Sequence, residues 1–138
     1  QDKVIAGQPV IDDAGIVAAY RSAVCVVLPS VYDDMYGQHT NVPELLGQTL
    51  LEGMACGTPG LCTDVASLPE IVRHNQTGFI VPAHDAEAMR SALMRLADNA
   101  HLVEQLGAAA AADVRARFSW SRVVQECLRH YRRDRRES

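Results

Sequence analysis

Residues 24–64 read VCVVLPSVYDDMYGQHTNVPELLGQTLLEGMACGTPGLCTD, and this stretch decides the fold. Its first five residues are apolar and are followed by a Pro-Ser pair, as expected for a strand that is buried on both faces of a parallel sheet. A polar loop over 31–43 comes next, and 47–56 is helix-like and ends at a Gly-Thr-Pro stop. Residues 60–64 are a second strand candidate. A strand, a helix and a strand in this order predict a parallel α/β sheet.

The rest of the chain continues this alternation. A short strand is predicted at Val4–Ala6, and Asp12–Arg21 has apolar residues at helical spacing. The later elements are a short helix at 67–72, a strand at 79–81, a helix capped by Asp85, a helix at 102–117 and a last helix capped by Ser119. Two of these helices carry an apolar face, which we expect to be buried. In the helix capped by Asp85 this face comprises Met89, Ala92, Leu93, Leu96 and Ala97. In the last helix it comprises Trp120, Val123, Val124, Cys127, Leu128 and Tyr131.

The composition is that of one globular domain. The chain has 138 residues, of which 48% are apolar and 22% charged, close to the average for soluble proteins. The formal net charge of −4 disfavours nucleic acid as a partner. Five arginines crowd the C-terminus, either as a solvated helix end or as a contact with an anionic membrane: Arg129, Arg132, Arg133, Arg135 and Arg136.

The cysteines predict a cytoplasmic chain. Cys25, Cys56, Cys62 and Cys127 form no CxxC pair and lie in apolar stretches, which is typical of reduced core residues. No apolar stretch approaches the roughly 20 residues of a membrane span, and the N-terminus does not resemble a signal peptide. Because the chain opens on Gln1 and enters a strand-like run at once, we expect it to be part of a longer protein.

The candidate site surrounds the start of the helix at 47–56. Glu44 precedes this helix, and Glu52 lies within it among apolar neighbours, where an ionised carboxylate needs a partner. In open α/β sheets, ligands collect at the carboxyl ends of the strands, beside the N-termini of the following helices. The free amides around Gly47, Gln48 and Thr49 therefore predict a diphosphate site, and the glycine allows close approach of a ligand.

The spacing of Glu44 and Glu52 suits a ligand with two hydroxyl-bearing rings joined through a diphosphate. Eight residues at about 1.5 Å each separate the two carboxylates by roughly 12 Å along a helix. A carboxylate accepts two hydrogen bonds well, so one glutamate would hold a ribose and the other a hexose. The residues alone leave a second interpretation open, in which Glu44 is a surface loop residue and Glu52 reaches solvent or a basic neighbour.

Residues 44–59 resemble the Glu-x₇-Glu segment of the retaining nucleotide-sugar glycosyltransferases of family four, which have two facing Rossmann domains. The flanking segments agree in order over nearly the whole chain: Gly7 after a strand, Tyr20 before VCVVLPS, then DVASLPEIV, TGFIVPAHDAEAM and RFSW. The resemblance implies an α/β, Rossmann-like parallel sheet flanked by helices, with 1–138 forming the C-terminal donor-binding domain. It also implies that the first strand-helix units of that domain are absent.

The resemblance assigns roles to residues of this chain. Glu44 matches the catalytic-site glutamate that contacts hydroxyls of the transferred sugar, and Glu52 matches the one that holds the ribose. The resemblance implies two further groups of donor-binding residues. The turn beside the diphosphate and sugar comprises Leu45, Leu46, Gly47, Gln48 and Thr49. The segment near the nucleobase contains Gly7, Pro9 and Val10. Family members retain the anomeric configuration and need no metal or other cofactor, since basic side chains and helix amides stabilise the leaving diphosphate.

Three departures from the family pattern stand out. Leu45-Leu46 replaces a Gly-Phe pair after the first glutamate, and Ala66-Ser67 replaces a Gly-Gly pair before Leu-Pro-Glu. The loop over 31–43 is long, so that Asp34, His39 and Asn41 either contact the acceptor or sugar, or only tether the chain.

The resemblance also implies what lies elsewhere. The basic residues that hold the donor phosphates and the acceptor domain with its catalytic histidine are upstream in the family, so we expect this chain alone to be inactive. The strand at Val4–Ala6 would lose its neighbours and would be unpaired, re-paired or swapped, leaving an edge prone to self-association. A peripheral position at the inner face of a membrane stays open.

Two rival functions remain on the same scaffold. One is a nucleotide-sugar-binding module without transfer, and the other is half of a sugar-nucleotide epimerase. A response-regulator-like domain is disfavoured because the chain lacks an acidic cluster at strand ends followed by a lysine.

Overall fold

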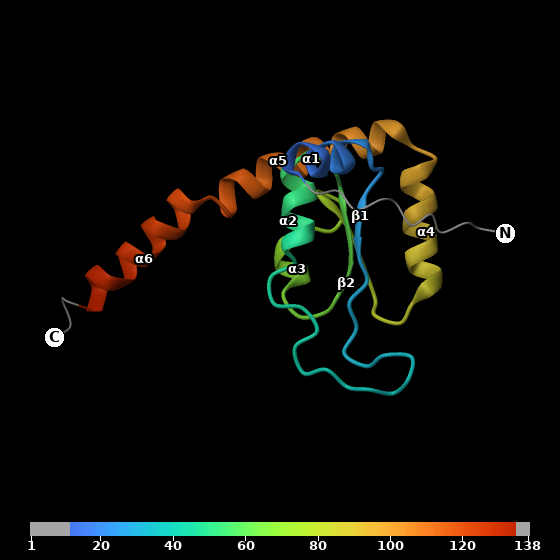
Figure 1. Ribbon diagram of the computed structural model, residues 1–138, viewed down its shortest axis with the longest axis horizontal. Helices are drawn as coiled ribbons and strands as arrows, with labels where there is room; N and C mark the ends of the chain where they lie inside the picture. Colours follow the sequence, from blue (N-terminus) through green and yellow to red (C-terminus); the bar gives the residue numbers. More distant parts are fainter. Residues whose placement is uncertain (1–11, 135–138) are drawn as a thin grey trace.

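The structure is a computed structural model that describes residues 12–134, and its centre is a parallel sheet (Figure 1). The strands β1 (Val26–Leu28), β2 (Gly60–Thr63) and β3 (Gly78–Val81) pair in the order β1-β2-β3. Each crossover between neighbouring strands passes through a helix, as parallel pairing requires. The α/β, Rossmann-like sheet expected from the sequence is confirmed.

Helices cover both faces of this sheet (Figure 1). The helices of residues 12–134 are α1 (Asp13–Ser22), α2 (Gln48–Ala55), α3 (Leu68–Ile71), α4 (Ala86–Ala97), α5 (Ala100–Arg117) and α6 (Trp120–Asp134). Helices α2 and α3 pack on one face, α4 packs on the other, and α5 contributes to both. Four helices begin where a side chain accepts a hydrogen bond from an early backbone amide, as N-caps do: Asp12 for α1, Asp85 for α4, Asn99 for α5 and, as predicted, Ser119 for α6.

Two hydrophobic clusters form the core, one on each side of the sheet. The first gathers side chains of α2, α3 and α5 around β1 and β2, and the second gathers α4 and α5 around β2 and β3. Successive strand residues face opposite sides, so Leu61 and Cys62 of β2 are both fully buried, in different clusters. Helix α5 joins the clusters, because Leu106 belongs to one and Val114 to the other.

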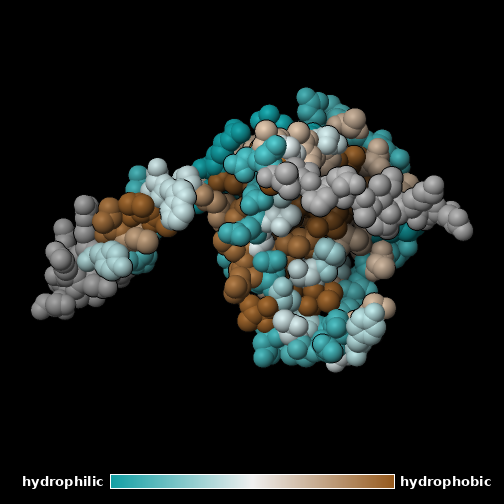
Figure 2. All heavy atoms as spheres, viewed as in Figure 1, coloured by the Kyte–Doolittle hydropathy of each residue, from teal (hydrophilic) through white to brown (hydrophobic). Residues whose placement is uncertain are grey.

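Strand β1 departs from the prediction. It covers three residues instead of five, and Val24 and Val27 are 45% and 37% exposed. Among the described residues β1 is an edge strand, so that one of its sides faces no other strand. In the same view, hydrophobic side chains are visible on the surface over the region where Figure 1 shows the strands (Figure 2). The predicted strand at Val4–Ala6 and the predicted nucleobase contacts Gly7, Pro9 and Val10 lie outside the described residues.

Helix α6 extends away from the rest of the domain (Figure 1). Its apolar stripe, expected to be buried, is exposed, with Trp120 83% and Tyr131 71% accessible. Cys127 on this helix is exposed, so the prediction that it is a core residue is wrong. In α4, Leu93 and Ala97 are likewise exposed. The periodicity was present in both helices, but too little of the described protein packs against these positions to bury them.

The other cysteines behave more nearly as predicted. Cys62 is buried, Cys25 and Cys56 are half-buried, and all four cysteines are free thiols. Burial, with a smaller contribution from the charge of Asp64, raises the pKa of Cys62 to about 12. None of the helices in residues 12–134 combines the length and hydrophobicity that crossing a membrane would need.

Candidate functional site

A pocket of about 550 Å³ opens at the N-terminal end of α2. It is lined by Glu44, Leu45, Leu46, Gln48 and Thr49. Gly47, which lies between these residues in the chain, is buried. Five of the predicted donor-binding residues, which are neighbours in the chain, thus line one pocket on the side of the sheet where the carboxyl end of β1 leads into α2.

Gly47 fixes how the chain enters α2. It is the N-cap residue and has a φ of 62°, in the left-handed region where a side chain is unfavourable. A Cβ atom at this position would lie 2.9 Å from Cδ1 of Ile71 and 3.0 Å from Cδ2 of Leu68. The backbone conformation therefore favours glycine, and the close contact with α3 adds to this preference.

Glu44 is hydrogen-bonded to the turn that precedes α2. Its Oε1 accepts the amide of Gly47 at 2.9 Å and that of Leu46 at 3.2 Å. The Gly47 amide is the main cause of a lowered pKa of Glu44, which desolvation partly opposes and the Leu46 and Leu45 amides assist. The side chain is thus an anion at neutral pH. Because Oε1 accepts both of these hydrogen bonds, Oε2 is left to accept a hydrogen bond from a ligand.

These two hydrogen bonds change which amides a diphosphate would meet. Two of the amides expected at the diphosphate and sugar, those of Leu46 and Gly47, already donate to Glu44. Gln48 and Thr49 occupy the first two helical positions of α2, where amides have no intrahelical acceptor. These two amides, at the positive end of the helix dipole, are the better anion donors.

Glu52 lies on the exposed face of α2, outside the lining of the pocket. The side chains that point inward from this helix are Leu50 and Met54, so the expectation that Glu52 is surrounded by apolar residues is wrong. Residues three and four apart are neighbours on a helix surface, which places Glu52 one turn beyond Gln48 and Thr49. A ligand that extends from the pocket along this face would reach Glu52.

A tyrosine that was not identified from the sequence as a site residue binds Glu52. The hydroxyl of Tyr20 in α1 donates to Oε2 of Glu52 at 3.0 Å. The pKa of Tyr20 is raised, first by burial and then by the hydrogen bond and the negative charge of Glu52. The sequence placed Tyr20 on the apolar stripe of its helix, but only the packing of α1 against α2 brings the two side chains together.

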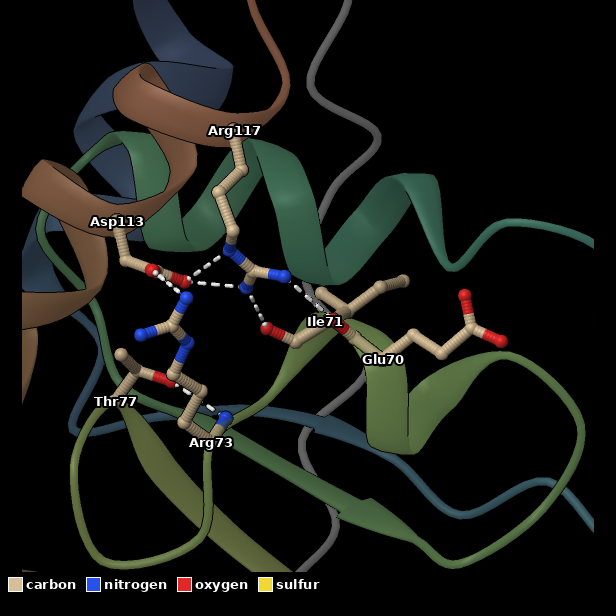
Figure 3. Close-up of polar contacts among 6 residues, drawn as sticks. All are labelled: Glu70, Ile71, Arg73, Thr77, Asp113 and Arg117. Carbon is tan, nitrogen blue, oxygen red and sulfur yellow. Dashed lines mark hydrogen bonds and ion pairs between the residues drawn. The ribbon is translucent and has the colours of Figure 1, made fainter.

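Helix α3, which supports Gly47, is held at its C-terminal end by Arg117 of α5 (Figure 3). The guanidinium donates to the carbonyl oxygens of Glu70 at 2.7 Å and Ile71 at 2.8 Å. These are carbonyls that a helix end leaves without partners. Asp113 accepts from Nε of Arg117 at 2.8 Å and pairs with Arg73 at 3.1 Å. The position of α3 is therefore tied to α5.

The long loop contains a small hairpin, here called the 32–40 hairpin. Thr40 donates to the carbonyl of Tyr32 at 2.7 Å, and Oδ1 of Asp34 accepts two amides across the turn, each at 2.8 Å. Nδ1 of His39 lies 2.8 Å from Oδ1 of Asp33. The contacts of Asp34 and His39 are thus made within the hairpin, which favours a structural role for both. Asn41 is exposed beside it.

Comparison with known proteins connects this geometry to a family. The family model described as glycosyl transferases group 1 matches residues 3–113. The chain belongs to the group 1 glycosyltransferases. The family match includes the whole pocket, whereas α6 lies beyond it.

Two relatives of this group 1 glycosyltransferase chain have names that refer to inositol compounds. The phosphatidyl-myo-inositol mannosyltransferase of Mycobacterium leprae is 36% identical over 121 residues, which are 88% of this chain and 29% of the relative. The D-inositol 3-phosphate glycosyltransferase of Streptomyces griseus is 35% identical over 117 residues, or 85% of this chain and 22% of the relative. The chain thus spans less than a third of the length of these relatives.

A solved structure agrees with the family. Sucrose-phosphate synthase from Thermosynechococcus elongatus superposes with a TM-score of 0.74 at 30% identity, covering 96% of this chain and 30% of that one. The Rossmann-like fold of the group 1 glycosyltransferase chain is therefore supported by sequence and by structure.

Proposed function

We propose that residues 1–138 are the C-terminal donor-binding domain of a retaining glycosyltransferase and bind a nucleotide diphosphate sugar. The observation that carries the proposal is the pocket of about 550 Å³ at the start of α2, with the Glu44 carboxylate in its lining. An anionic acceptor of hydrogen bonds suits sugar hydroxyls, and the adjacent helix N-terminus suits a diphosphate. Family membership supports this assignment.

The donor would lie along the exposed face of α2. Oε2 of Glu44 would accept from hydroxyls of the transferred sugar, and the amides of Gln48 and Thr49 would contact the diphosphate. Glu52, one turn further, would accept the ribose hydroxyls in place of the Tyr20 hydroxyl that it binds in the structure. The helix amides would stabilise negative charge as the diphosphate leaves. The proposal requires no metal or other cofactor.

The acceptor would be bound by a second domain, which is the proposed partner of this chain. Two relatives are named for inositol-containing compounds and a third for sucrose phosphate, so polyols, sugars and their phosphates are the first acceptor class to test. The exposed edge of β1 would pair with that partner or with a second chain. Free cysteines are consistent with a cytoplasmic location.

Binding without transfer is the alternative function, as a nucleotide-sugar-binding module or as half of a sugar-nucleotide epimerase. The names of the relatives above, two transferases and a synthase, favour transfer.

The proposal is tested by titrating the chain with UDP-, GDP- and ADP-sugars while its amide resonances are followed by NMR. We expect one nucleotide class to give saturable shifts at Gln48, Thr49 and Glu52. Absence of saturable shifts with all three classes would overturn the proposal.

A pair of variants tests the role of Glu52. Glu52→Ala is expected to weaken nucleotide-sugar binding about tenfold, because charge-assisted hydrogen bonds to the ribose are lost. Tyr20→Phe removes the hydroxyl that binds the same carboxylate and serves as the control, with affinity expected within about threefold of the unsubstituted chain. Equal losses in the two variants would show that the α1–α2 contact matters instead of a ribose contact.

A further inference from the structure

The side chain of Ser67 holds the pocket turn from a distance in sequence. Its hydroxyl donates to the carbonyl oxygen of Leu45 at 3.0 Å, across 22 residues. Ser67 is the N-cap residue of α3, yet its side chain makes no capping bond to that helix. Serine at this position usually accepts an amide of its own helix. Here the hydroxyl binds the loop that lines the pocket.

The two sides of one peptide group are fixed by different residues. Ser67 binds the Leu45 carbonyl, while the amide of Leu46 in the same peptide group donates to Glu44 at 3.2 Å. A peptide group is planar, so its C=O and N–H turn together. Rotation of this group would therefore break the bond to Ser67 and the bond to Glu44 at the same time.

The neighbouring contacts keep Ser67 itself in place. The residues that follow it, Leu68 and Ile71 of α3, pack against Gly47, and Arg117 binds the carbonyls at the end of the same helix. Ala66 has a φ of 50°, and its amide donates to the hydroxyl of Tyr32 at 3.1 Å. A non-glycine residue in this region is held there by its surroundings.

We propose that Ser67 is a positioning residue for the sugar side of the donor pocket. Its hydroxyl fixes the Leu45–Leu46 peptide group, and through that group it sets the orientation of the Glu44 carboxylate toward the transferred sugar. The proposal rests on the proposed function for its ligand, but the orientation of Glu44 is a property of the free chain. The two are therefore testable separately.

The first measurement needs no ligand. The carboxyl carbon of Glu44 is titrated by NMR in the unsubstituted chain, in Ser67→Ala and in Ser67→Thr. Ser67→Ala is expected to move the midpoint of Glu44 upward, toward the ordinary glutamate value, and to shift the Leu46 amide resonance. Ser67→Thr keeps a hydroxyl and is expected to restore both. The same midpoint in all three chains would overturn the inference.

The second measurement compares two ligands. For the nucleotide class that binds, affinity is measured for the sugar nucleotide and for the nucleoside diphosphate alone. Ser67→Ala is expected to weaken sugar-nucleotide binding about fivefold, the effect of about one hydrogen bond, and nucleoside diphosphate binding by less than twofold. Equal weakening of both ligands would show a general structural role and would overturn the inference.

A matched control is available in α1. The hydroxyl of Ser22 also donates to a backbone carbonyl, that of Ala19 at 2.9 Å, but within its own helix. Ser22→Ala is expected to change neither measurement. If the unsubstituted chain binds no nucleotide sugar, the proposed function fails while the titration still decides the role of Ser67. If that chain binds and Ser67→Ala alters neither readout, only the inference about Ser67 fails.

Discussion

The connection between β1 and α2 contains two segments that are held in different ways. The 32–40 hairpin is closed mainly by bonds within itself, such as those of Asp34. The turn that lines the pocket is instead fixed from outside, by Ser67 on Leu45 and by α3 against Gly47. Local sequence therefore determines the shape of the hairpin, whereas the core determines the shape of the pocket turn. A substitution should therefore change the stability of the whole domain only when it lies in the pocket turn.

Two glycines make this difference measurable. Gly47 in the pocket turn and Gly37 in the hairpin have φ values of 62° and 78°. Alanine at Gly47 would also meet Ile71 and Leu68, whereas alanine at Gly37 would meet nothing within 4 Å. We expect Gly47→Ala to lower the free energy of unfolding by about 3 kcal/mol and Gly37→Ala by about 1 kcal/mol. Urea unfolding of both variants checks this prediction. Equal losses would show that α3 does not constrain the turn.

The arginine that holds α3 gives the next largest expected effect. Arg117→Lys keeps the positive charge but loses the fork that binds the carbonyls of Glu70 and Ile71. We expect it to lower the free energy of unfolding by about 1–2 kcal/mol. Arg90→Lys is the control, because Arg90 binds Glu87 on the exposed surface of α4, where salt bridges contribute little to stability. A loss at Arg117 no greater than at Arg90 would contradict the proposed support of α3.

The smallest effect concerns the pH dependence that Glu44 adds. Its pKa is lowered in the folded chain, mainly by the Gly47 amide. The ionised Glu44 carboxylate therefore stabilises the folded chain fully when the pH is above 4.5, the ordinary pKa of a glutamate. This stabilisation is lost as the pH falls through the lowered pKa of the folded chain. Glu44→Gln should flatten the stability profile in that acidic range and leave its shape above pH 4.5 unchanged. In an NMR titration, the Gly47 amide should follow the midpoint of Glu44, and independent midpoints would contradict the hydrogen bond between them.

Much of the fold follows from local patterns in the sequence. The strands at β2 and β3 and the cap at Asp85 depend on neighbouring residues, and all three were predicted within one residue of their observed positions. Burial was predicted less well, because it depends on what packs against a face. The apolar stripe of α6 has helical spacing, yet Trp120 on it is 83% exposed.

The candidate site shows the same limit. The double-glutamate segment and its glycine were visible in the sequence, and the fold places five of the predicted residues around one pocket. Whether they bind a donor stays a prediction. The partners of the site residues were missed, because the Tyr20–Glu52 bond spans 32 residues and the Ser67–Leu45 bond spans 22. Such contacts arise only when segments far apart in the sequence pack together.

Helix α5 has a consequence for the order of folding during synthesis. Ala110 and Val114 complete the cluster that surrounds Leu50 and Met54 of α2, which precede them by 56 to 64 residues (110 − 54 and 114 − 50). A chain still emerging from the ribosome would expose the apolar face of α2 until α5 had been made. We therefore expect no stable intermediate that contains only β1, α2 and β2, and chains truncated before α5 should aggregate instead of folding.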